Sequence, residues 1–284
     1  MNSAGMEKLL GIVRVERNTS LYPPLLGEIF DPPAVLYVRG TLPNPERPAV
    51  ALVGTRSPSP AACREALRLG REFARRGITV VSGLALGIDA LAHRGCLDGG
   101  GSTVAVLGSS VDEVYPASNR SLARRILENG GALVSEYPCG TKPRKWFFPQ
   151  RNRIISGFAR GTVIVEAPAS SGALYTGQFA LEQGRDLFVA SSGVSSPLGE
   201  GTRRLAAEGC RIISAAEEVL IEWNMSKADQ AGPPPEYDAA CPGAVREAVL
   251  SGHGTSGAVR TAASGYAGAV QTGLADSLRQ ELGL

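Results

Sequence analysis

Short apolar runs alternate with helix-favouring segments along most of this chain, and no other feature of the sequence restricts the fold as strongly. Gly or Ser residues bound the runs, as is usual for buried strands. The expected strands cover residues 49–53, 79–81, 103–107, 132–135, 162–165, 186–189 and 211–213. The expected helices cover residues 62–76, 88–97, 119–128, 174–183, 202–208 and 215–223. Because strands joined through helices pair in parallel, the pattern predicts a doubly wound, mostly parallel α/β sheet of the Rossmann-like kind.

The two ends of the chain differ from this central region. Residues 21–42 contain two Pro-Pro pairs before an apolar run at 34–38, which predicts a loop leading to an edge strand. Residues 225–238 are polar and include three consecutive prolines, as in a linker, because proline lacks an amide donor. Two further helices are expected near 243–250 and 269–282. We therefore expect a Rossmann-like domain over 1–224, a linker over 225–240 and a small helical module over 241–284.

Charge and cysteine content exclude several classes of protein. The net charge is only +2, so any affinity for a polyanion must come from local clusters of cations. Five cysteines without a CxxC pair indicate neither a disulfide framework nor a zinc site. No stretch approaches the roughly 18 to 20 apolar residues that span a bilayer, and no signal-peptide pattern is present. A cytoplasmic location without membrane insertion is expected.

The standard nucleotide-cofactor motifs are missing from the sequence. The strand at 49–53 leads into Gly54-Thr55-Arg56 rather than GxGxxG, and there is no GxxxxGK[ST]. Neither a dinucleotide nor a P-loop triphosphate is therefore expected, and we expect no cofactor or metal. A doubly wound sheet still binds ligands at the carboxyl ends of its strands, so the loops at that edge are the place to search.

Two glycine-containing turns follow strands and open helices. Ser82-Gly83 begins the first turn, whose backbone amides could approach a phosphate at the start of a helix. An ordinary tight turn that needs glycine explains the same residues equally well. Ser171-Gly172, with Thr176 one turn later, forms the second, and an ordinary helix cap is again just as common.

The stretch from 141 to 160 combines cations with aromatic rings and has no carboxylate. Its cations are Lys142, Arg144, Lys145, Arg151, Arg153 and Arg160, and the aromatic residues Trp146, Phe147 and Phe148 lie inside this cluster. Cations that follow a phosphate backbone and rings that stack on unpaired bases are the combination that single-strand binders use. The alternative is that the rings pack in the core while the cations are merely solvated.

Other polar residues carry a weaker signal. Arg56 stands at the end of a strand, where its guanidinium could grip a phosphate with two bonds, although a capping or salt-bridging arginine fits equally. His93 lies within an expected helix, and a structural role is favoured. The carboxylates Asp89, Asp112, Glu136 and Glu166 show no acid and base spacing. We find no nucleophile constellation, so an enzyme is not expected.

Read in order, these segments resemble the DNA-processing protein A (DprA/Smf) family across roughly residues 12–221. The motifs are VGTR at 53–56, SGLALGIDALAH at 82–93, the Tyr115-Pro116 turn with Asn119, SEYP at 135–138, FPQRNRII at 148–155, VIVEA at 163–167 and SGALYT at 171–176. The resemblance implies a Rossmann-like protein, usually dimeric, that holds single-stranded DNA in a basic crevice. It also implies protection of incoming DNA and the loading of RecA recombinase in natural transformation and recombination, without enzymatic activity.

The resemblance assigns roles to individual residues. Arg56, Lys145, Arg151 and Arg153 are expected to contact phosphates, and Phe148 is expected to be the stacking platform. Asn152 is expected to make a polar contact or to fix its loop. The expected DNA-binding set is Arg56, Ser82, Gly83, Lys145, Phe148, Arg151, Asn152, Arg153, Ser171, Gly172 and Thr176.

The chain departs from the family pattern at Ser192, where a Pro-Gly turn is usual, and at Arg203, where Asn is common. Residues 263–284 resemble the family's winged-helix-like module but stop where a wing would follow, so a truncated module is expected. Two other functions stay open. One is a nucleotide-processing enzyme of the phosphoribohydrolase kind, whose PGGxGTxxE motif residues 192–203 match only in part. The other is a nucleotide sensor or structural partner protein.

Overall fold

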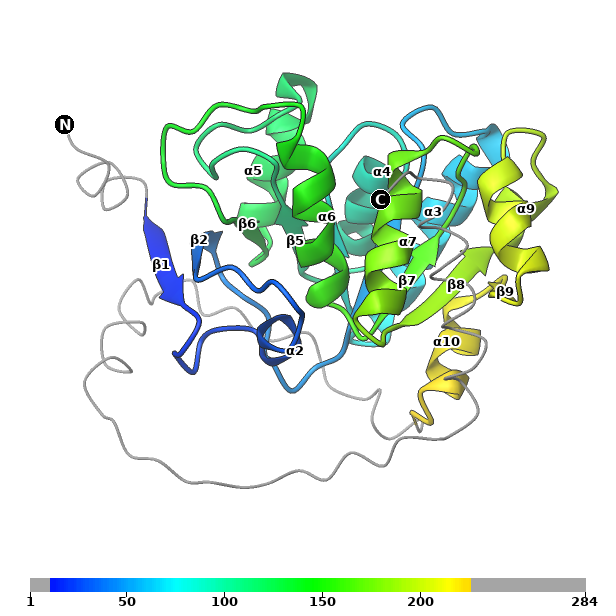
Figure 1. Ribbon diagram of the computed structural model, residues 1–284, viewed down its shortest axis with the longest axis horizontal. Coiled ribbons are helices and arrows are strands. Elements are labelled where there is room, and N and C mark those ends of the chain that lie inside the picture. The colour runs from blue at the N-terminus through cyan, green and yellow to red at the C-terminus, as the bar shows by residue number, and fades with distance from the viewer. Residues whose placement is uncertain (1–10, 226–284) are drawn as a thin grey trace.

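The computed structural model describes residues 11–225, in which nine strands form a single sheet (Figure 1). The linker expected at 225–240, apart from Met225, and the helical module expected at 241–284 lie outside the described residues. The strands are β1 (Ile12–Glu16), β2 (Val35–Gly40), β3 (Ala49–Val53), β4 (Thr79–Ser82), β5 (Thr103–Val106), β6 (Ala132–Ser135), β7 (Gly161–Ile164), β8 (Asp186–Ala190) and β9 (Arg211–Ile213). The helices are α2 (Pro24–Gly27), α3 (Pro60–Arg75), α4 (Ile88–Asp98), α5 (Arg120–Glu128), α6 (Phe147–Gly157), α7 (Gly172–Glu182), α8 (Ser191–Ser195), α9 (Glu200–Ala207) and α10 (Ala216–Glu222), with a 3-10 turn at Ala117–Asn119.

The strand order is β1-β2-β6-β5-β4-β3-β7-β8-β9, and the run from β6 to β9 is parallel throughout. From the central strand β3, the chain builds outward first through β4, β5 and β6, and afterwards on the other side through β7, β8 and β9. The order therefore reverses between β3 and β7. A crevice opens at such a switch point beyond the carboxyl ends of the strands. The predicted doubly wound, mostly parallel α/β fold is confirmed.

Side chains of β3 alternate between the two layers that cover the sheet. Val50 and Leu52 pack in a cluster with Phe73 of α3 and Leu220 of α10. Ala51 and Val53 face the opposite layer, where the helices α6, α7 and α9 contribute apolar side chains. Because every residue of β3 is buried, the strand reads as a continuous apolar run rather than as an alternating one.

Three differences from the sequence-based expectations affect the edges and the site. The strand expected at 34–38 exists as β2, but it is not an edge strand, because β1 pairs with it antiparallel on one side and β6 on the other. The strand β1 was not expected. The helix α6 lies inside the stretch interpreted only as a cationic cluster.

No helix within residues 11–225 is long and apolar enough to cross a membrane.

Candidate nucleic-acid interface

A pocket of about 710 Å³ lies at the switch point, between the end of β3, the start of α7 and one face of α6. We call it the carboxyl-edge pocket. Eight of the residues expected in the DNA site line it. These are Arg56, Lys145, Phe148, Arg151, Asn152, Ser171, Gly172 and Thr176. The structure therefore brings together residues that are up to 120 positions apart in the sequence.

The turn after β3 is held rigidly, and this fixes the base of Arg56. The amide of Thr55 donates to the Glu166 carbonyl at 2.8 Å, and the Thr55 carbonyl accepts from the Ile88 amide at 3.1 Å. Gly87, at a positive φ of 75°, packs so closely on the backbone of Thr55 and Arg56 that no side chain fits there. The exposed guanidinium of Arg56 lies 6.0 Å from the ring centroid of Phe148.

One face of α6 forms a wall of the pocket. Phe148, Arg151, Asn152 and Ile155 all line it, and their spacing of three, four and seven residues places them along one side of a helix. The half-buried Phe148 ring lies over Gly108, where an added Cβ would come within 2.7 Å of it. The Phe148 ring is therefore neither fully buried in the core nor fully exposed to solvent.

Tyr115 also packs against the Phe148 ring. The two centroids are 5.5 Å apart with the rings tilted by 45°, and Tyr115 is 49% exposed. Neither Gly108 nor Tyr115 was among the expected site residues. The family resemblance marked Tyr115 only as part of a turn, and the packing of both residues against Phe148 joins segments that are distant in sequence.

The floor of the pocket is a buried cation. Arg151 is 4% exposed, and its guanidinium donates to the Val106 carbonyl and, at 2.8 Å, to the Gly83 carbonyl. Burial lowers the pKa of Arg151 to about 10, and the nearby Asp89 carboxylate opposes that shift. Burial raises the pKa of Asp89, while Arg151 opposes the rise. A pKa near 10 keeps the guanidinium charged at neutral pH.

Ser82 and Gly83 lie beneath the pocket rather than on its lining. The Ser82 hydroxyl donates to the Leu52 carbonyl at 2.7 Å. The Gly83 amide, which the sequence offered as a phosphate donor, instead donates to the Asp89 carboxylate at 3.1 Å. A Cβ on Gly83 would lie 2.7 Å from that carboxylate and 2.5 Å from Arg151 Nη2, so this glycine admits the close approach of the two charged groups.

Arg153 lies outside the lining of the pocket. It is two residues beyond Arg151, and on a helix that interval turns a side chain by about 200°. Its guanidinium forms a two-bond pair with Glu136, at 2.8 Å for each bond, and a further pair with Asp31 at 3.1 Å. These bonds tie α6 to the β6 loop and to the loop after α2.

The start of α7 closes the third side of the pocket. Ser171 caps the helix, because its hydroxyl accepts from the Ala173 amide at 3.3 Å. The Asn152 side-chain amide donates to the Gly172 carbonyl at 3.1 Å and so joins α6 to α7. Thr176 is 1% exposed and contributes to the inner wall. The partial positive charge of a helix start thus faces the same cavity as Arg56 and Arg151.

Comparison with known proteins identifies the family of the chain. The family model for DNA recombination-mediator protein A matches residues 14–224. The chain belongs to this family.

Relatives of the DNA recombination-mediator protein A family match the same region. The chain is 42% identical over 203 residues to protein Smf of Synechocystis, covering 70% of this chain and 51% of the relative. It is 38% identical over 214 residues to DNA processing protein DprA of Bacillus subtilis, covering 75% and 71%. The chain thus spans about half the length of the Synechocystis relative.

Two solved structures of the family are also similar. The crystal structure of DprA from Streptococcus pneumoniae matches with a TM-score of 0.69 and 35% identity, covering 78% of both chains. A structure of DprA from Helicobacter pylori matches with a TM-score of 0.66 and 27% identity, covering 79% of this chain and 98% of that one. The latter was reported for the single-stranded DNA binding mode of that protein.

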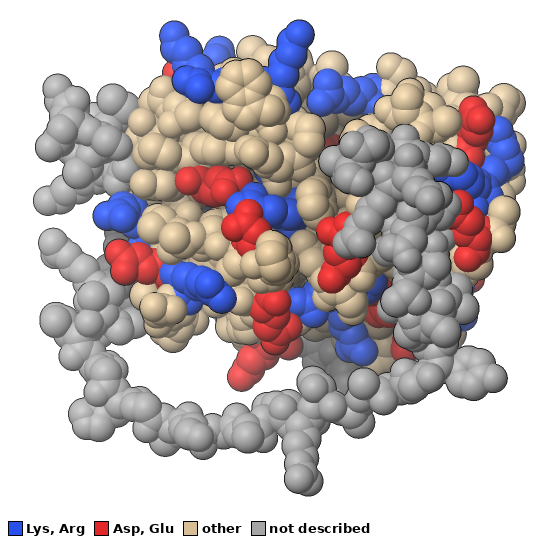
Figure 2. Space-filling view, in the orientation of Figure 1, with Lys and Arg blue, Asp and Glu red and all other residues tan. Residues whose placement is uncertain are grey.

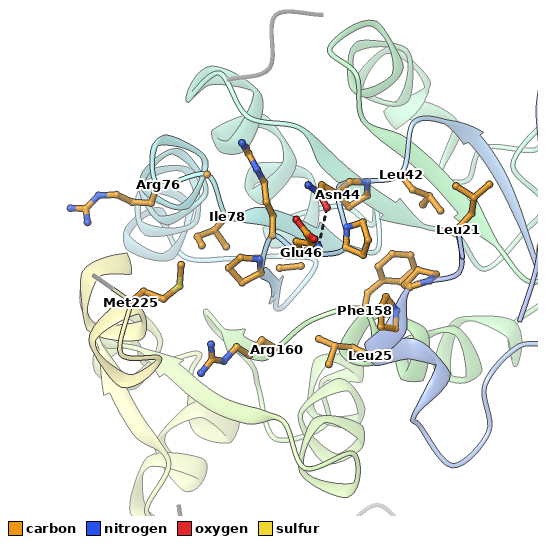
Figure 3. Close-up of a pocket in the computed structure, with 18 of the residues that line it drawn as sticks. Leu21, Leu25, Leu42, Asn44, Glu46, Arg76, Ile78, Phe158, Arg160 and Met225 are labelled. Carbon is orange, nitrogen blue, oxygen red and sulfur yellow. Dashed lines mark hydrogen bonds between the residues drawn. The ribbon is translucent and has the colours of Figure 1, made fainter. Parts of the chain in front are cut away.

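A second, larger cavity of about 920 Å³ lies at the amino ends of the strands (Figure 3). Its lining includes Leu25, Phe158 and several prolines. Two of its cations are already engaged: Arg76 pairs with Glu217, and the guanidinium of Arg160 lies 5.1 Å from the Trp223 ring centroid. The carboxyl-edge pocket, although smaller, is therefore the better candidate for the binding site, because its exposed cations lie beside the half-buried Phe148 ring.

The charged side chains on the surface also differ between the carboxyl ends and the amino ends of the strands. In Figure 2, Lys and Arg side chains project from the upper rim, where the carboxyl ends of the strands lie, whereas most Asp and Glu side chains on this face lie lower. The segment before α6 contributes the exposed cations Lys142, Arg144 and Lys145. The family's fold therefore presents a cationic rim beside the pocket despite a net charge of only +2.

Residues 192–203, which match the nucleotide-enzyme motif in part, form hydrogen bonds with other groups of the protein. The Gly201 amide donates to the Ala167 carbonyl at 2.8 Å, and the Thr202 hydroxyl donates to the Gly193 carbonyl at 2.9 Å. The guanidinium of Arg203 donates to the Ser196 carbonyl. These bonds leave the start of α9 engaged with protein groups instead of open toward a phosphate.

His93 is a core residue, as the sequence favoured. It is fully buried, and its Nδ1 lies 2.8 Å from the Thr103 hydroxyl, which itself donates to the Val80 carbonyl at 2.5 Å. Since that hydroxyl has a single proton, Nδ1 must donate to it, and Nε2 is left as a buried acceptor with no hydrogen-bond partner among residues 11–225. Burial lowers the pKa of His93 to about 3.

Proposed function

We propose that this protein binds single-stranded DNA in the carboxyl-edge pocket. The observation that carries the proposal is the half-buried Phe148 ring at the rim, flanked by the exposed cations Arg56 and Lys145 above the buried cation Arg151. Cations neutralise phosphates of any sequence, and a ring stacks on any base, so this combination suits an unpaired strand. The Helicobacter pylori relative studied for its binding of single-stranded DNA supports the proposal.

The burial of each residue suggests a division of roles within the expected set. Arg56 and Lys145 are exposed and would contact phosphates, and Phe148 would stack on a base. Asn152, Ser171, Gly172 and Thr176 line the wall and would bind or shape the sugar-phosphate chain. Ser82 and Gly83 would act from below by positioning Asp89 and Arg151.

Arg151 and Arg153 take different parts in this proposal. Arg151 would supply charge to the floor without leaving its carbonyl partners, since it is almost fully buried. Arg153 would position α6 through Glu136 and Asp31 rather than contact the strand. A guanidinium with two carboxylate partners would have to break these ion pairs before it could bind a phosphate.

The wider role proposed for the protein comes from its family. We infer that it protects incoming DNA and helps to load RecA recombinase onto it in natural transformation and recombination, as a cytoplasmic homodimer that carries out no reaction on the DNA. We also infer that the Rossmann-like domain, residues 1–224, holds the DNA site and that the linker and small module follow it.

A filter-binding assay with three ligands tests the proposed function. At low salt, the protein should retain oligo-dT more tightly than a duplex of equal length and should barely retain a mononucleotide. Raising the salt should weaken oligo-dT binding, with a log-log slope of about −0.7 for each phosphate neutralised. Tighter retention of duplex would contradict the proposal. Tight retention of a mononucleotide would favour the nucleotide enzyme or sensor instead.

A further inference from the structure

A second exposed ring stands beside the carboxyl-edge pocket but does not line it. Trp146 is 58% exposed at the position that precedes the first turn of α6. An indole this exposed leaves apolar surface in water, and such surface commonly marks a contact site for a ligand. The pocket lining includes both Lys145 and Phe148 but not Trp146.

The Trp146 ring rests on a stack of other aromatic rings. Its centroid lies 6.0 Å from that of Phe147 in an edge-to-face arrangement, and Phe147 in turn stacks on Tyr137 at 3.9 Å. The guanidinium of Arg144 lies 5.7 Å from the centroids of both Trp146 and Phe147. These contacts hold the indole in place while leaving more than half of it open.

The surroundings of Trp146 carry positive charge. Lys142, Arg144 and Lys145 are exposed on the same segment, and none of the ion pairs within residues 11–225 involves them. A carboxylate is also missing from the sequence between 141 and 160. A fixed ring flanked by cations that form no ion pair within residues 11–225 repeats, outside the pocket, the chemistry of Phe148 with Arg56.

The two rings face different sides of the start of α6. Phe148 contacts Tyr115 and Arg56 on the pocket side, whereas Trp146 contacts Phe147 and Arg144. A strand that leaves the pocket past Lys145 would therefore meet Trp146 next. We infer that Trp146 is a second base-stacking platform, which extends the single-stranded DNA track beyond the pocket with Arg144 and Lys142 as its phosphate contacts. This inference rests on the proposed function.

Tryptophan fluorescence tests the inference directly, because the chain has only two tryptophans and Trp223 is 4% exposed. A base stacked on the indole should quench the emission of Trp146. Titration with oligo-dT of about 20 nucleotides should therefore lower the fluorescence of the full chain. A Trp146→Phe variant should bind the same oligonucleotide, measured by anisotropy of a label on the DNA, but should lose most of the quenching.

Affinity gives an independent readout. Trp146→Ala should weaken binding of the long oligonucleotide roughly tenfold, within the range for one lost stacking contact. Binding of an oligonucleotide of about four nucleotides, which the pocket alone can hold, should change little. Phe30→Ala, which removes a fully exposed ring on a different loop, is the matched control and should bind both oligonucleotides normally.

The results separate this inference from the proposed function. If oligo-dT binds but quenches no Trp146 emission, and Trp146→Ala binds both lengths like the unaltered chain, the extended track is refuted and the pocket stands. If Trp146→Ala weakens the short and long oligonucleotides equally, the ring belongs to the pocket and the extension is again wrong. If no single strand binds at low salt, both proposals fail.

Discussion

Arg56 and Phe148 line the same pocket and contact each other, but their removal should weaken binding in different ways. Arg56→Ala removes an exposed cation from the end of β3, and with it one phosphate contact and its released counterion. The magnitude of the salt slope should fall by about 0.7 for oligo-dT. Over a fourfold rise in salt, from about 50 to about 200 mM, the affinity gap between wild type and variant should therefore shrink about 2.6-fold.

Phe148→Ala should leave the salt slope nearly unchanged, because no charge is lost. Gly108 and Tyr115 already contact the ring, so a single base can stack on what remains exposed. We expect a loss in the lower part of the stacking range, about 1 to 2 kcal/mol or roughly 5- to 30-fold in Kd. The assay is fluorescence anisotropy of labelled oligo-dT at several salt concentrations.

Thermal unfolding is the control for both variants. If Phe148→Ala lowers Tm strongly while the folded fraction binds DNA normally, the ring is a packing residue and the stacking argument is refuted. An Arg56→Ala variant with unchanged affinity and unchanged salt slope would remove the pocket at the end of β3 from the DNA path. The 6.0 Å contact between the two side chains also predicts that the double variant loses less than the sum of the single losses.

Three further predictions follow from packing and charge. Gly108→Ala should weaken oligo-dT binding severalfold by displacing the Phe148 ring, and an unchanged Kd would show that the ring's position is unimportant. Arg153→Ala should lower the free energy of unfolding by about 1 to 3 kcal/mol while leaving the salt slope unchanged, and a reduced slope would make Arg153 a phosphate contact. Burial lowers the pKa of His93 in the folded protein to about 3, below the unfolded value of 6.5. The stability that the neutral ring contributes is therefore complete above about pH 6.5 and is lost as the pH falls toward 3. The loss is up to about 1.4 kcal/mol per pH unit. His93→Gln should flatten that dependence in urea unfolding measured from pH 7 to pH 4, and an unaltered dependence would contradict the assignment.

The parallel core could be predicted from sequence because its strands are buried on both faces. The continuous apolar run of β3 and the similar runs of β4 to β8 stand out from the helices around them. The strand β1 has only five residues and buries just two of them, in a segment with few other signals. Without β1, β2 looks like an edge strand. Only the pairing between distant segments reveals its true position.

The sequence was enough to predict which segments form the candidate site, but not the directions in which their side chains point. The segment 147–157 begins with aromatic residues and Pro149, which hides its helical character, although proline is tolerated in a first turn. Taken as a loop, the segment let Arg151 and Arg153 face one crevice together. As a helix, it sends them to opposite sides. The spacing of Phe148, Arg151, Asn152 and Ile155 was the signal that would have fixed this phase.

The attachment of Arg151 to the carbonyls of Gly83 and Val106 has a consequence for the thermodynamics of binding. Since α6 is secured from below before any strand arrives, the protein side of the interface has little conformational freedom left to lose. The entropy lost on association should then fall almost wholly on the DNA. Pre-stacked, stiff strands should therefore bind with a smaller entropic penalty than flexible ones, a difference that calorimetry of oligo-dA against oligo-dT would resolve.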